Sequence, residues 1–361
     1  MNIFKKVSIF AGVILIVGLI VFLNQTNRSK EVLKIGLMAP LSGEYAVAGQ
    51  NIEKGVELAL EQYEKENPSV DIQLIVEDDG FVVQKGITAF KKLKDIDKVD
   101  SLIMVSTPVI DAIHEDINKL DFPVIQLGIQ TTGVDDDNIF QTSSAPEAPI
   151  KLFAQYLDDT YDFKNVAVVY DNTAGGLTFF KSFEETYEGK IDPMIINNKS
   201  DIKGHVAKIT ANNYDSVVFL TSPENGALAT KEILNIDTTP PLFAFDAQLQ
   251  TGFTDYGRIL GDTNLLNGSL SIWFKSGDTQ KFNDDFKNKF GEEPGFFADF
   301  GYDSFNILMG GYSSATDNWI NNIQNTKGKG VSGDISFDEN GIRLQDIVVN
   351  KVVDGKITPI K

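Results

Sequence analysis

Small or polar residues stand directly after most of the short apolar runs in this chain. They are Ser106, Thr107, Gly128, Asp171, Thr221, Ser222 and Asp246. If the runs are parallel strands, their carboxyl ends lie along one edge of a sheet, which is where open α/β sheets bind ligands. Each residue alone is explained as well by a cap or a turn. Their recurrence favours a shared crevice that binds a small molecule.

The segment Ser106-Thr107-Pro108 predicts the start of a helix that could hold an anion. Thr107 suits the N-cap and Pro108 suits the first helical position, and an apolar stripe follows at helical spacing. The free amides of a helix N-terminus, with a hydroxyl beside them, form a ready site for a carboxylate. A plain cap without a ligand is the alternative.

Asp246 and several aromatic residues are further candidates for a binding site. Asp246 follows Phe243-Ala244-Phe245, and an ionised carboxylate beside aromatic rings could bind an ammonium group. The alternative is a turn at the end of a strand. Candidates for the wall of a pocket are Tyr45, Phe296, Phe297, Phe300 and Tyr302, although aromatic residues are more often part of a core.

Catalytic and metal-binding motifs are missing from the sequence. Glu77–Asp79 and Asp135–Asp137 are acidic but lack the spacing of a calcium loop, so we expect solvated loops there. His114 and His205 accompany no nucleophile motif, and no G-x-S-x-G, phosphate loop, H-E-x-x-H or dinucleotide pattern occurs. The sequence therefore predicts a binding protein without a metal or cofactor, and not an enzyme.

Composition narrows the class of partner. The chain has 361 residues, which exceeds one comfortable core and predicts two lobes. Its net charge of −19 argues against nucleic acid, because phosphate binding needs clustered Lys and Arg. The chain has no cysteine, which excludes disulfides, thiol catalysis and a lipid-modified cysteine.

The N-terminus carries an uncharged apolar run over Val7–Leu23, directly after Lys5 and Lys6. Its 17 residues are at the short end for a membrane helix and beyond the usual apolar region of a signal peptide. No small-x-small cleavage site follows. We expect an uncleaved anchor with the rest of the chain outside the membrane; a cleaved signal peptide is the alternative.

After a polar linker, apolar runs alternate with stretches of helical period, which predicts parallel sheets with crossover helices. Predicted strands are Ile35–Met38, Ile72–Val76, Ser101–Val105, Val124–Leu127, Val166–Tyr170, Ser216–Leu220 and Leu242–Phe245. Predicted helices include Gln84–Lys94, Thr107–Leu120 and Gln280–Phe290.

The expected organisation is an N-terminal anchor and linker (1–31) followed by two lobes, each made of two segments. Crossings between the lobes are expected near Gln141–Ser144, Ile272–Ser276 and Val331–Ser336. Lobe I would then comprise 32–142 and 275–332, and lobe II 143–274 and 333–361.

Three segments resemble a known family. Lys34–Glu64 reads as a strand, a Pro-Leu-Ser-Gly turn and an amphipathic helix. FNDDFKNKFGEEPGFFADFGYDSFNIL (Phe282–Leu308) and GVSGDISFDENGIR (Gly330–Arg343) follow in order. Together they are similar to the type I solute-binding proteins, in the branch that binds branched-chain amino acids. The likeness covers nearly the whole chain from about Val32.

The resemblance implies two Rossmann-like α/β lobes that close over a ligand and deliver it to an ABC permease in the membrane. Carried over by position, Ser106 or Thr107 would bind the ligand carboxylate, and Asp246 would meet its α-ammonium. The segment Gly128–Thr131, with Gln130 and Thr131, stands where the family has a loop that supplies backbone groups and a hydroxyl.

The sequence departs from the family at the side-chain pocket. Gly175 and Ser222 stand where the family has pocket tyrosines, Ala48 replaces a bulkier residue, and Gln130 breaks the usual Thr loop. The ligand therefore need not be leucine, isoleucine or valine. We expect the extracytoplasmic receptor of an ABC transporter that captures a small amino acid or a related amide; the alternative is a ligand-sensing ectodomain of the same fold.

Overall fold

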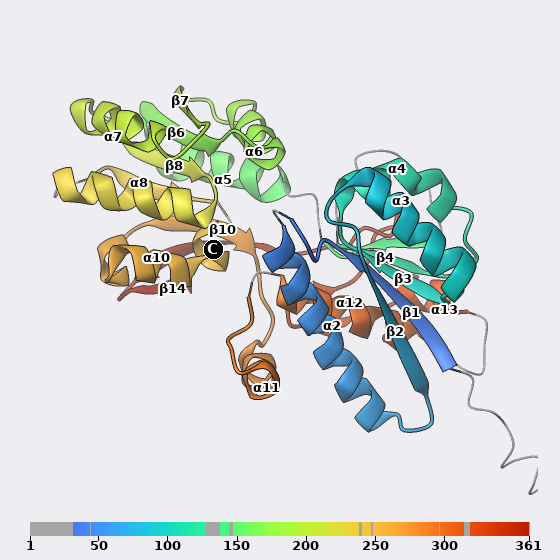
Figure 1. Ribbon diagram of the computed structural model, residues 1–361. Coiled ribbons are helices and arrows are strands. Elements are labelled where there is room, and N and C mark those ends of the chain that lie inside the picture. Colours follow the sequence, from blue (N-terminus) through green and yellow to red (C-terminus); the bar gives the residue numbers. More distant parts are fainter. Residues whose placement is uncertain are drawn as a thin grey trace, which may run out of the picture.

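The computed structural model describes residues 32–43, 45–127, 138–143, 147–237, 240–246, 248–295, 297–313 and 318–360. They form two α/β units, and each unit is built on its own sheet. Connecting segments of the chain join the two units (Figure 1). The predicted anchor, Val7–Leu23, lies outside the described residues. Within the described part of the chain, no helix is both long and apolar enough to cross a membrane.

The first unit contains a five-stranded parallel sheet in the order β2-β1-β3-β4-β5. Its strands are β1 (Val32–Ala39), β2 (Asp71–Asp78), β3 (Ser101–Met104), β4 (Val124–Gln126) and β5 (Ile139–Gln141). Its helices are α2 (Ala46–Glu66), α3 (Val83–Lys91), the wider turn η1 (Lys92–Asp97), α4 (Thr107–Ile117), α11 (Gln280–Phe290), α12 (Ala298–Gly311) and α13 (Trp319–Gln324).

Alternation along the strands divides the core of this unit between the two faces of the sheet. Leu37 of β1 packs with Val56 of α2 and Phe305 of α12 on one face. Met38, the next residue, packs with Ile110 of α4 on the other. Because both faces are covered, the strands are apolar on both sides, which is why the sequence shows them as continuous apolar runs.

The second unit contains a seven-stranded sheet in the order β14-β13-β10-β9-β8-β6-β7. Its strands are β6 (Asn165–Asp171), β7 (Lys190–Ile196), β8 (Ser216–Leu220), β9 (Leu242–Phe245), β10 (Leu270–Phe274), β13 (Ile347–Val353) and β14 (Lys356–Pro359). Its helices are α5 (Glu147–Thr160), α6 (Ala174–Glu184), α7 (Asp201–Ala211), α8 (Pro223–Ile236), α9 (Gln248–Thr251), α10 (Phe253–Leu260) and η2 (Thr263–Leu266). The strands from β7 to β10 are parallel, whereas β13 is antiparallel to β10 and β14.

The chain passes between the units three times, after β5, after β10, and between the small hairpin β11 (Gly328–Gly330)–β12 (Gly333–Ile335) and β13. Ile342 still bridges Gln141 of β5, and the Arg343 amide donates to the Gln141 carbonyl at 2.9 Å. The chain therefore stays in contact with the first unit as far as Arg343. The predicted boundary at residue 333 stays a prediction.

The predicted strands lie at the observed strands, and Gln280–Phe290 is a helix as expected. The sequence predicted no strand at β5, β7 or β10, and β7 contains Lys190 and Pro193. This strand is at the edge of the sheet, where proline is tolerated because one side of the strand donates no ladder hydrogen bonds. The prediction for α4 was wrong by one position: Ser106 is the N-cap and Pro108 lies inside the first turn.

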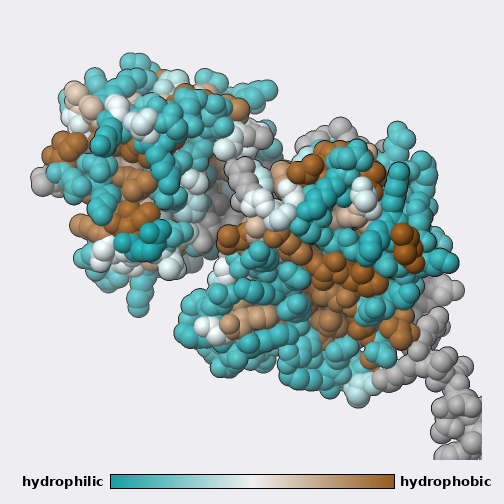
Figure 2. Space-filling view, viewed as in Figure 1, coloured by the Kyte–Doolittle hydropathy of each residue, from teal (hydrophilic) through white to brown (hydrophobic). Residues whose placement is uncertain are grey.

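Hydrophilic residues cover most of the visible surface of both units, and a hydrophobic stretch lies over β1 and β2 of the first unit (Figure 2). Few charged side chains of the described residues are buried. Among the described residues, the buried charged side chains are Asp79, Asp171, Asp246, Asp303 and Arg343. Burying a charge is costly unless it is paired or serves a function, so each of these positions requires an explanation.

Candidate ligand-binding cleft

Three of the buried carboxylates lie at the carboxyl ends of parallel strands. Asp79 follows β2, Asp171 ends β6 and Asp246 follows β9. This is the edge of a parallel α/β sheet where ligands bind. In the first unit, α2 also begins at the side that faces the second unit (Figure 1). The strand ends of the two sheets therefore define the candidate cleft.

In the first unit, Asp79 and Ser106 form a buried pair. The Ser106 hydroxyl donates to Oδ1 of Asp79 at 2.7 Å, and the Phe81 amide donates to the same oxygen at 2.8 Å. The expectation of a solvated loop was wrong for Asp79, which is fully buried. Its neighbour Asp78 accepts from the Leu41 and Gly80 amides and pairs with Lys85.

The second carboxylate oxygen of Asp79 is buried and has no hydrogen-bond partner within the described part of the chain. Burial raises the pKa of Asp79, while the hydrogen bonds from Phe81 and Ser106 oppose the rise. A buried acceptor without a donor costs about 1–3 kcal/mol. Asp79 is thus a polar group of the first unit that a ligand could satisfy. Nothing in the sequence distinguished it from the exposed acidic residues.

Ser106 and Thr107 lie where the sequence placed them, at the start of α4. The Ser106 hydroxyl is already used by Asp79, and Ser106 is buried, whereas Thr107 is half-buried. Of the two, Thr107 is the better placed to meet a ligand carboxylate. Gly128, Gln130, Thr131 and Phe296 lie outside the described residues, so their predicted contacts stay predictions.

In the second unit, Asp171, Ser222 and Asn225 are joined. The Ser222 amide donates to Oδ2 of Asp171 at 2.7 Å, and the Asn225 side-chain amide donates to Oδ1 at 2.8 Å. Ser222 is the exposed N-cap of α8, and its hydroxyl accepts from the Asn225 amide. The structure therefore brings together the polar residues that follow β6 and β8.

Asp246 lies beside this group and is buried (3 % exposed). Its Oδ1 accepts from the Gln248 amide at 3.0 Å, and the Gln248 side chain donates to the Thr221 hydroxyl at 2.8 Å. Burial raises the pKa of Asp246 to about 8, and the negative charge of Asp171 adds to the rise. Asp246 therefore holds a proton at neutral pH, and a cation bound beside it would favour the ionised form.

The two predicted tyrosines are placed differently. Tyr45 is exposed and its ring lies against Phe81, with ring centroids 4.3 Å apart, next to the Asp79 and Ser106 pair. The Tyr302 hydroxyl donates to Oε1 of Gln62 at 2.6 Å, and the ring packs edge-on against Phe282. Tyr302 thus connects α12 to α2, and the structure does not bring it together with the strand-end carboxylates.

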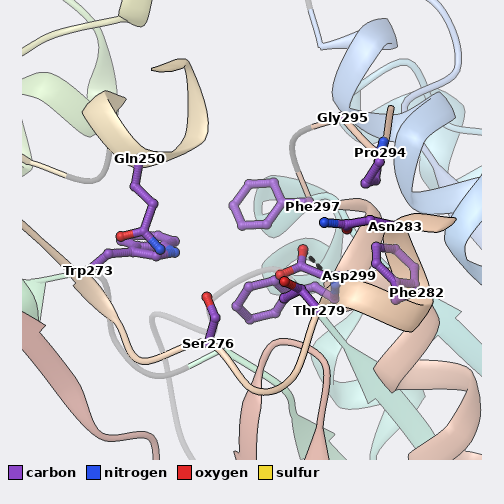
Figure 3. A pocket seen from close by; sticks show the side chains of 11 residues that line it. Gln250, Trp273, Ser276, Thr279, Phe282, Asn283, Pro294, Gly295, Phe297 and Asp299 are labelled. Atoms are coloured by element: carbon purple, nitrogen blue, oxygen red, sulfur yellow. Dashed lines mark hydrogen bonds between the residues drawn. The ribbon is translucent and has the colours of Figure 1, made fainter. Parts of the chain in front are cut away.

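A cavity of about 190 Å³ opens between the two units (Figure 3). Gln250 and Trp273 line it from the second unit; Asn283, Phe297 and Asp299 line it from the first. Phe297 and Phe300, which also lines the cavity, were among the aromatic residues expected to wall a pocket. Sequence reasoning missed Gln250, Trp273, Asn283 and Asp299. Trp273 is near the end of β10 at a predicted crossing, but no motif links it to a ligand.

The cavity lies near the strand end that carries Asp246. In the register of β9 and β10, Ser271 is opposite Phe245, so Trp273 and Asp246 stand near the carboxyl ends of neighbouring strands. Gln250 belongs to the same short helix, α9, as Gln248, the partner of Asp246. The cavity is therefore at the same edge of the second sheet as Asp246. No group of acidic or histidine residues in the described part of the chain could hold a metal ion.

Comparisons with known proteins agree with this geometry. The family model of periplasmic binding proteins matches residues 32–356. A Leu/Ile/Val-binding protein of Rhizobium johnstonii is 22 % identical over 252 residues, which cover 66 % of this chain and 68 % of that protein. A Leu/Ile/Val-binding protein homologue of Brucella melitensis is 26 % identical over 191 residues, covering 51 % and 47 %.

Two solved structures show the same fold. The branched-chain amino acid transporter substrate-binding protein LivJ of Streptococcus pneumoniae, in complex with isoleucine, superimposes with a TM-score of 0.75 at 18 % identity, covering 91 % of this chain and 99 % of that one. A solute-binding protein of an ABC transporter from R. palustris, in complex with benzoate, gives 0.72 at 20 % identity, covering 91 % and 96 %. The chain therefore belongs to the periplasmic binding protein family, with the type I fold that its sequence resembled.

Proposed function

We propose that this protein is the extracytoplasmic receptor of an ABC transporter and captures a small amino acid or a related amide between its two units. The observation that carries the proposal is the set of buried carboxylates at the strand ends, Asp79, Asp171 and Asp246. Such groups are costly to bury without a partner, and the ammonium of an amino acid would supply one. As a member of a family of binding proteins, the chain is not expected to catalyse a reaction.

The carboxylate of the ligand would meet the first unit. Thr107 is the first residue of α4, where the positive end of the helix dipole favours an anion. In the family pattern, the segment with Gln130 and Thr131 would add backbone groups. Asp246 and Ser222 would hold the ligand from the second unit. The names of the relatives and the isoleucine bound to LivJ support an amino acid.

The side chain of the ligand is less constrained. Gly175 stands where the family has a pocket tyrosine, and a Cβ at Gly175 would meet no atom within 4 Å. Ser222, at the position of a second tyrosine, is exposed. The open space at Gly175 supports a pocket wider than one that fits leucine, isoleucine or valine. The benzoate bound to the R. palustris protein is consistent with a fold that accepts varied ligands.

Localisation follows from the family, whose members act outside the cytoplasm. We propose further that Val7–Leu23 anchors the protein to the cell membrane, close to the permease that receives the ligand. The alternative function is a ligand-sensing ectodomain. It would bind its ligand in the same cleft, but its partner would be a signalling protein and not a permease. A permease and an ATPase encoded beside the gene would favour transport.

The ligand class is tested by thermal unfolding of the full chain against a panel of amino acids, with sugars and aromatic acids as comparison. A ligand at about 100 times its dissociation constant adds roughly 2.7 kcal/mol to the free energy of unfolding. An amino acid should raise the melting temperature. A shift produced by a sugar and by no amino acid would show that the ligand class is wrong.

Replacing Asp246 by Asn tests its contact with the ammonium. With the amino acid that the panel identifies, Asp246→Asn should weaken binding by about 2–5 kcal/mol, because it leaves a desolvated ammonium without a counter-charge. The matched control is Asp159→Asn, an exposed carboxylate on α5 of the same unit, which should change little. Equal affinities of wild type and Asp246→Asn in calorimetry would remove Asp246 from the site.

A further inference from the structure

The cavity between Trp273 and Phe297 has no assigned role in the capture of an amino acid backbone. Its volume of about 190 Å³ is below the roughly 300–1,000 Å³ of a pocket that encloses a whole drug-sized ligand. It therefore suits one end of a molecule whose other end lies elsewhere in the cleft. The nearest predicted contact for that other end is Asp246, one strand away from Trp273.

Charge in and behind this cavity is unbalanced. Of the described residues that line it, Asp299 is charged and none is Lys or Arg. Behind it, Arg343 and Asp303 form a buried ion pair at 3.5 Å. The remaining guanidinium bonds go to Thr142, Ser332, Gly333 and Asp334. The three charged groups thus carry a net charge of −1, because the single positive charge of Arg343 acts on both Asp303 and Asp299.

The charge of Asp299 is only partly compensated by Arg343, which it shares with Asp303. The Phe300 amide donates to Oδ1 of Asp299 at 3.0 Å. Burial raises the pKa of Asp299 to about 6, and the neighbouring negative charge of Asp303 adds to the rise. Ionised Asp299 is therefore present at neutral pH at a cost that a nearby cation would remove.

Aromatic side chains complete the surroundings. Trp273 reaches the cavity from the second unit and Phe297 from the first, with Asp299 below them (Figure 3). Phe297 has a left-handed backbone conformation (φ 66°). Such a conformation is costly for a bulky residue and is typical of functional sites. Tryptophan is the best of the aromatic faces for binding a cation, and phenylalanine also serves.

We propose that this cavity binds a positively charged nitrogen on the side chain of the ligand, held by Asp299 between the faces of Trp273 and Phe297. The inference rests on the proposed function, in which the α-carboxylate and α-ammonium lie at Thr107 and Asp246. It deepens that function by naming a class of substrate: amino acids whose side chain ends in an amine or guanidinium group.

The test uses the purified full chain, calorimetry and three probes. L-lysine carries the side-chain amine, L-norleucine has the same chain length without it, and 1,5-diaminopentane has amines but no α-carboxylate. L-lysine should bind more than about tenfold more tightly than L-norleucine, a difference that one desolvated charge pair can supply. Asp299→Asn should remove the preference for L-lysine over L-norleucine.

Two variants and a spectroscopic signal separate this role from a structural one. Asp284→Asn, an exposed carboxylate beside Asn283 on α11, should keep the preference for L-lysine. Trp273→Leu should reduce the preference for L-lysine over L-norleucine, which keeps the test valid if Asp299→Asn fails to fold. The chain has two tryptophans. In a Trp319→Phe background, L-lysine should therefore change the fluorescence of Trp273, whereas L-norleucine should not.

The outcomes distinguish the two proposals. If L-lysine and L-norleucine bind equally and Asp299→Asn binds both as wild type does, the cation subsite is overturned while the amino-acid receptor stands. If no amino acid binds but 1,5-diaminopentane binds in a manner that Asp299→Asn abolishes, the subsite stands and the amino-acid function fails. If neither L-lysine nor 1,5-diaminopentane binds, the subsite is overturned.

Discussion

Asp246 illustrates how burial sets the chemistry of one residue. Burial raises its pKa to about 8, so between pH 4 and 8 the folded protein holds a proton that the unfolded chain, with a pKa of about 3.9, releases. Folding is therefore favoured by this group below about pH 4, and that contribution is lost progressively as the pH rises towards 8. A ligand ammonium beside Asp246 would favour the ionised carboxylate and so lower its pKa.

The prediction is that Asp246→Asn changes the pH dependence of stability in the ligand-free protein. From pH 5 to pH 8, the free energy of unfolding should fall more steeply for wild type than for the variant, because asparagine does not titrate. The difference should exceed about 1.4 kcal/mol, the equivalent of one pKa unit. Urea unfolding at the two pH values measures it, and parallel pH dependences would contradict the burial of an ionisable group here.

Among the elements, the contact of α2 with α12 depends on glycines. A Cβ at Gly301 of α12 would lie 2.3 Å from the Ile52 carbonyl of α2, and one at Gly55 of α2 would lie 2.0 Å from the Ala298 carbonyl. Real side chains do not approach backbone atoms so closely, so the two helices would have to separate. This packing holds α12, and with it Phe297 and Asp299 at its start, against the sheet.

We predict that Gly301→Ala destabilises the protein by about 1–3 kcal/mol, the usual cost of overpacking, although alanine is the better helix former. The matched control is Gly310→Ala in the same helix, where a Cβ would meet nothing within 4 Å. That change should be neutral or stabilising by up to about 1 kcal/mol. Chemical denaturation compares the two, and equal effects would mean that the close approach of the helices does not limit stability.

For the whole molecule, Arg343 joins segments that are distant in the sequence. It is 1 % exposed and donates to the Thr142 carbonyl at the first crossing. Before the third crossing it donates to the Ser332 hydroxyl and to the Gly333 and Asp334 carbonyls. Its ion pair with Asp303 ties these segments to α12. Arg343 therefore holds the chain at two crossings on the side of the first unit.

Arg343→Met should cost about 3–5 kcal/mol of unfolding free energy, because it leaves the carboxylate of Asp303 buried without its counter-charge. Arg258→Met is the control. Its ion pair with Asp255 is exposed, and surface substitutions of this kind change stability by about 0.5 kcal/mol or less. Similar losses in both variants would show that the buried pair is not the main connection at the crossings.

Three crossings between two units predict a hinge. Ligand groups from both units meet only when the cleft closes, so a saturating ligand should shift the population towards a closed form. Small-angle scattering of the full chain should then give a smaller radius of gyration with ligand than without. An unchanged radius, with an open ligand-free form, would favour a rigid interaction protein that kept the fold.

The sequence by itself was sufficient for the architecture and for part of the site. Apolar runs alternating with helical periods follow from local side-chain spacing, which is why seven of the strands and the helix Gln280–Phe290 could be placed. The polar residues after the runs, Asp171, Ser222 and Asp246, converge as expected, because parallel strands share one carboxyl edge. The family patterns added the fold.

Tertiary structure alone decided which acidic residues are buried and which residues meet across the units. Asp79 and Asp78 are neighbours of the same type, yet Asp79 is fully buried against Ser106 and Asp78 pairs with Lys85 near the surface. Trp273 and Asp299 line one cavity although they belong to different units. Burial and proximity of this kind depend on how segments distant in the sequence pack together. The local periodicity of the sequence does not predict that packing.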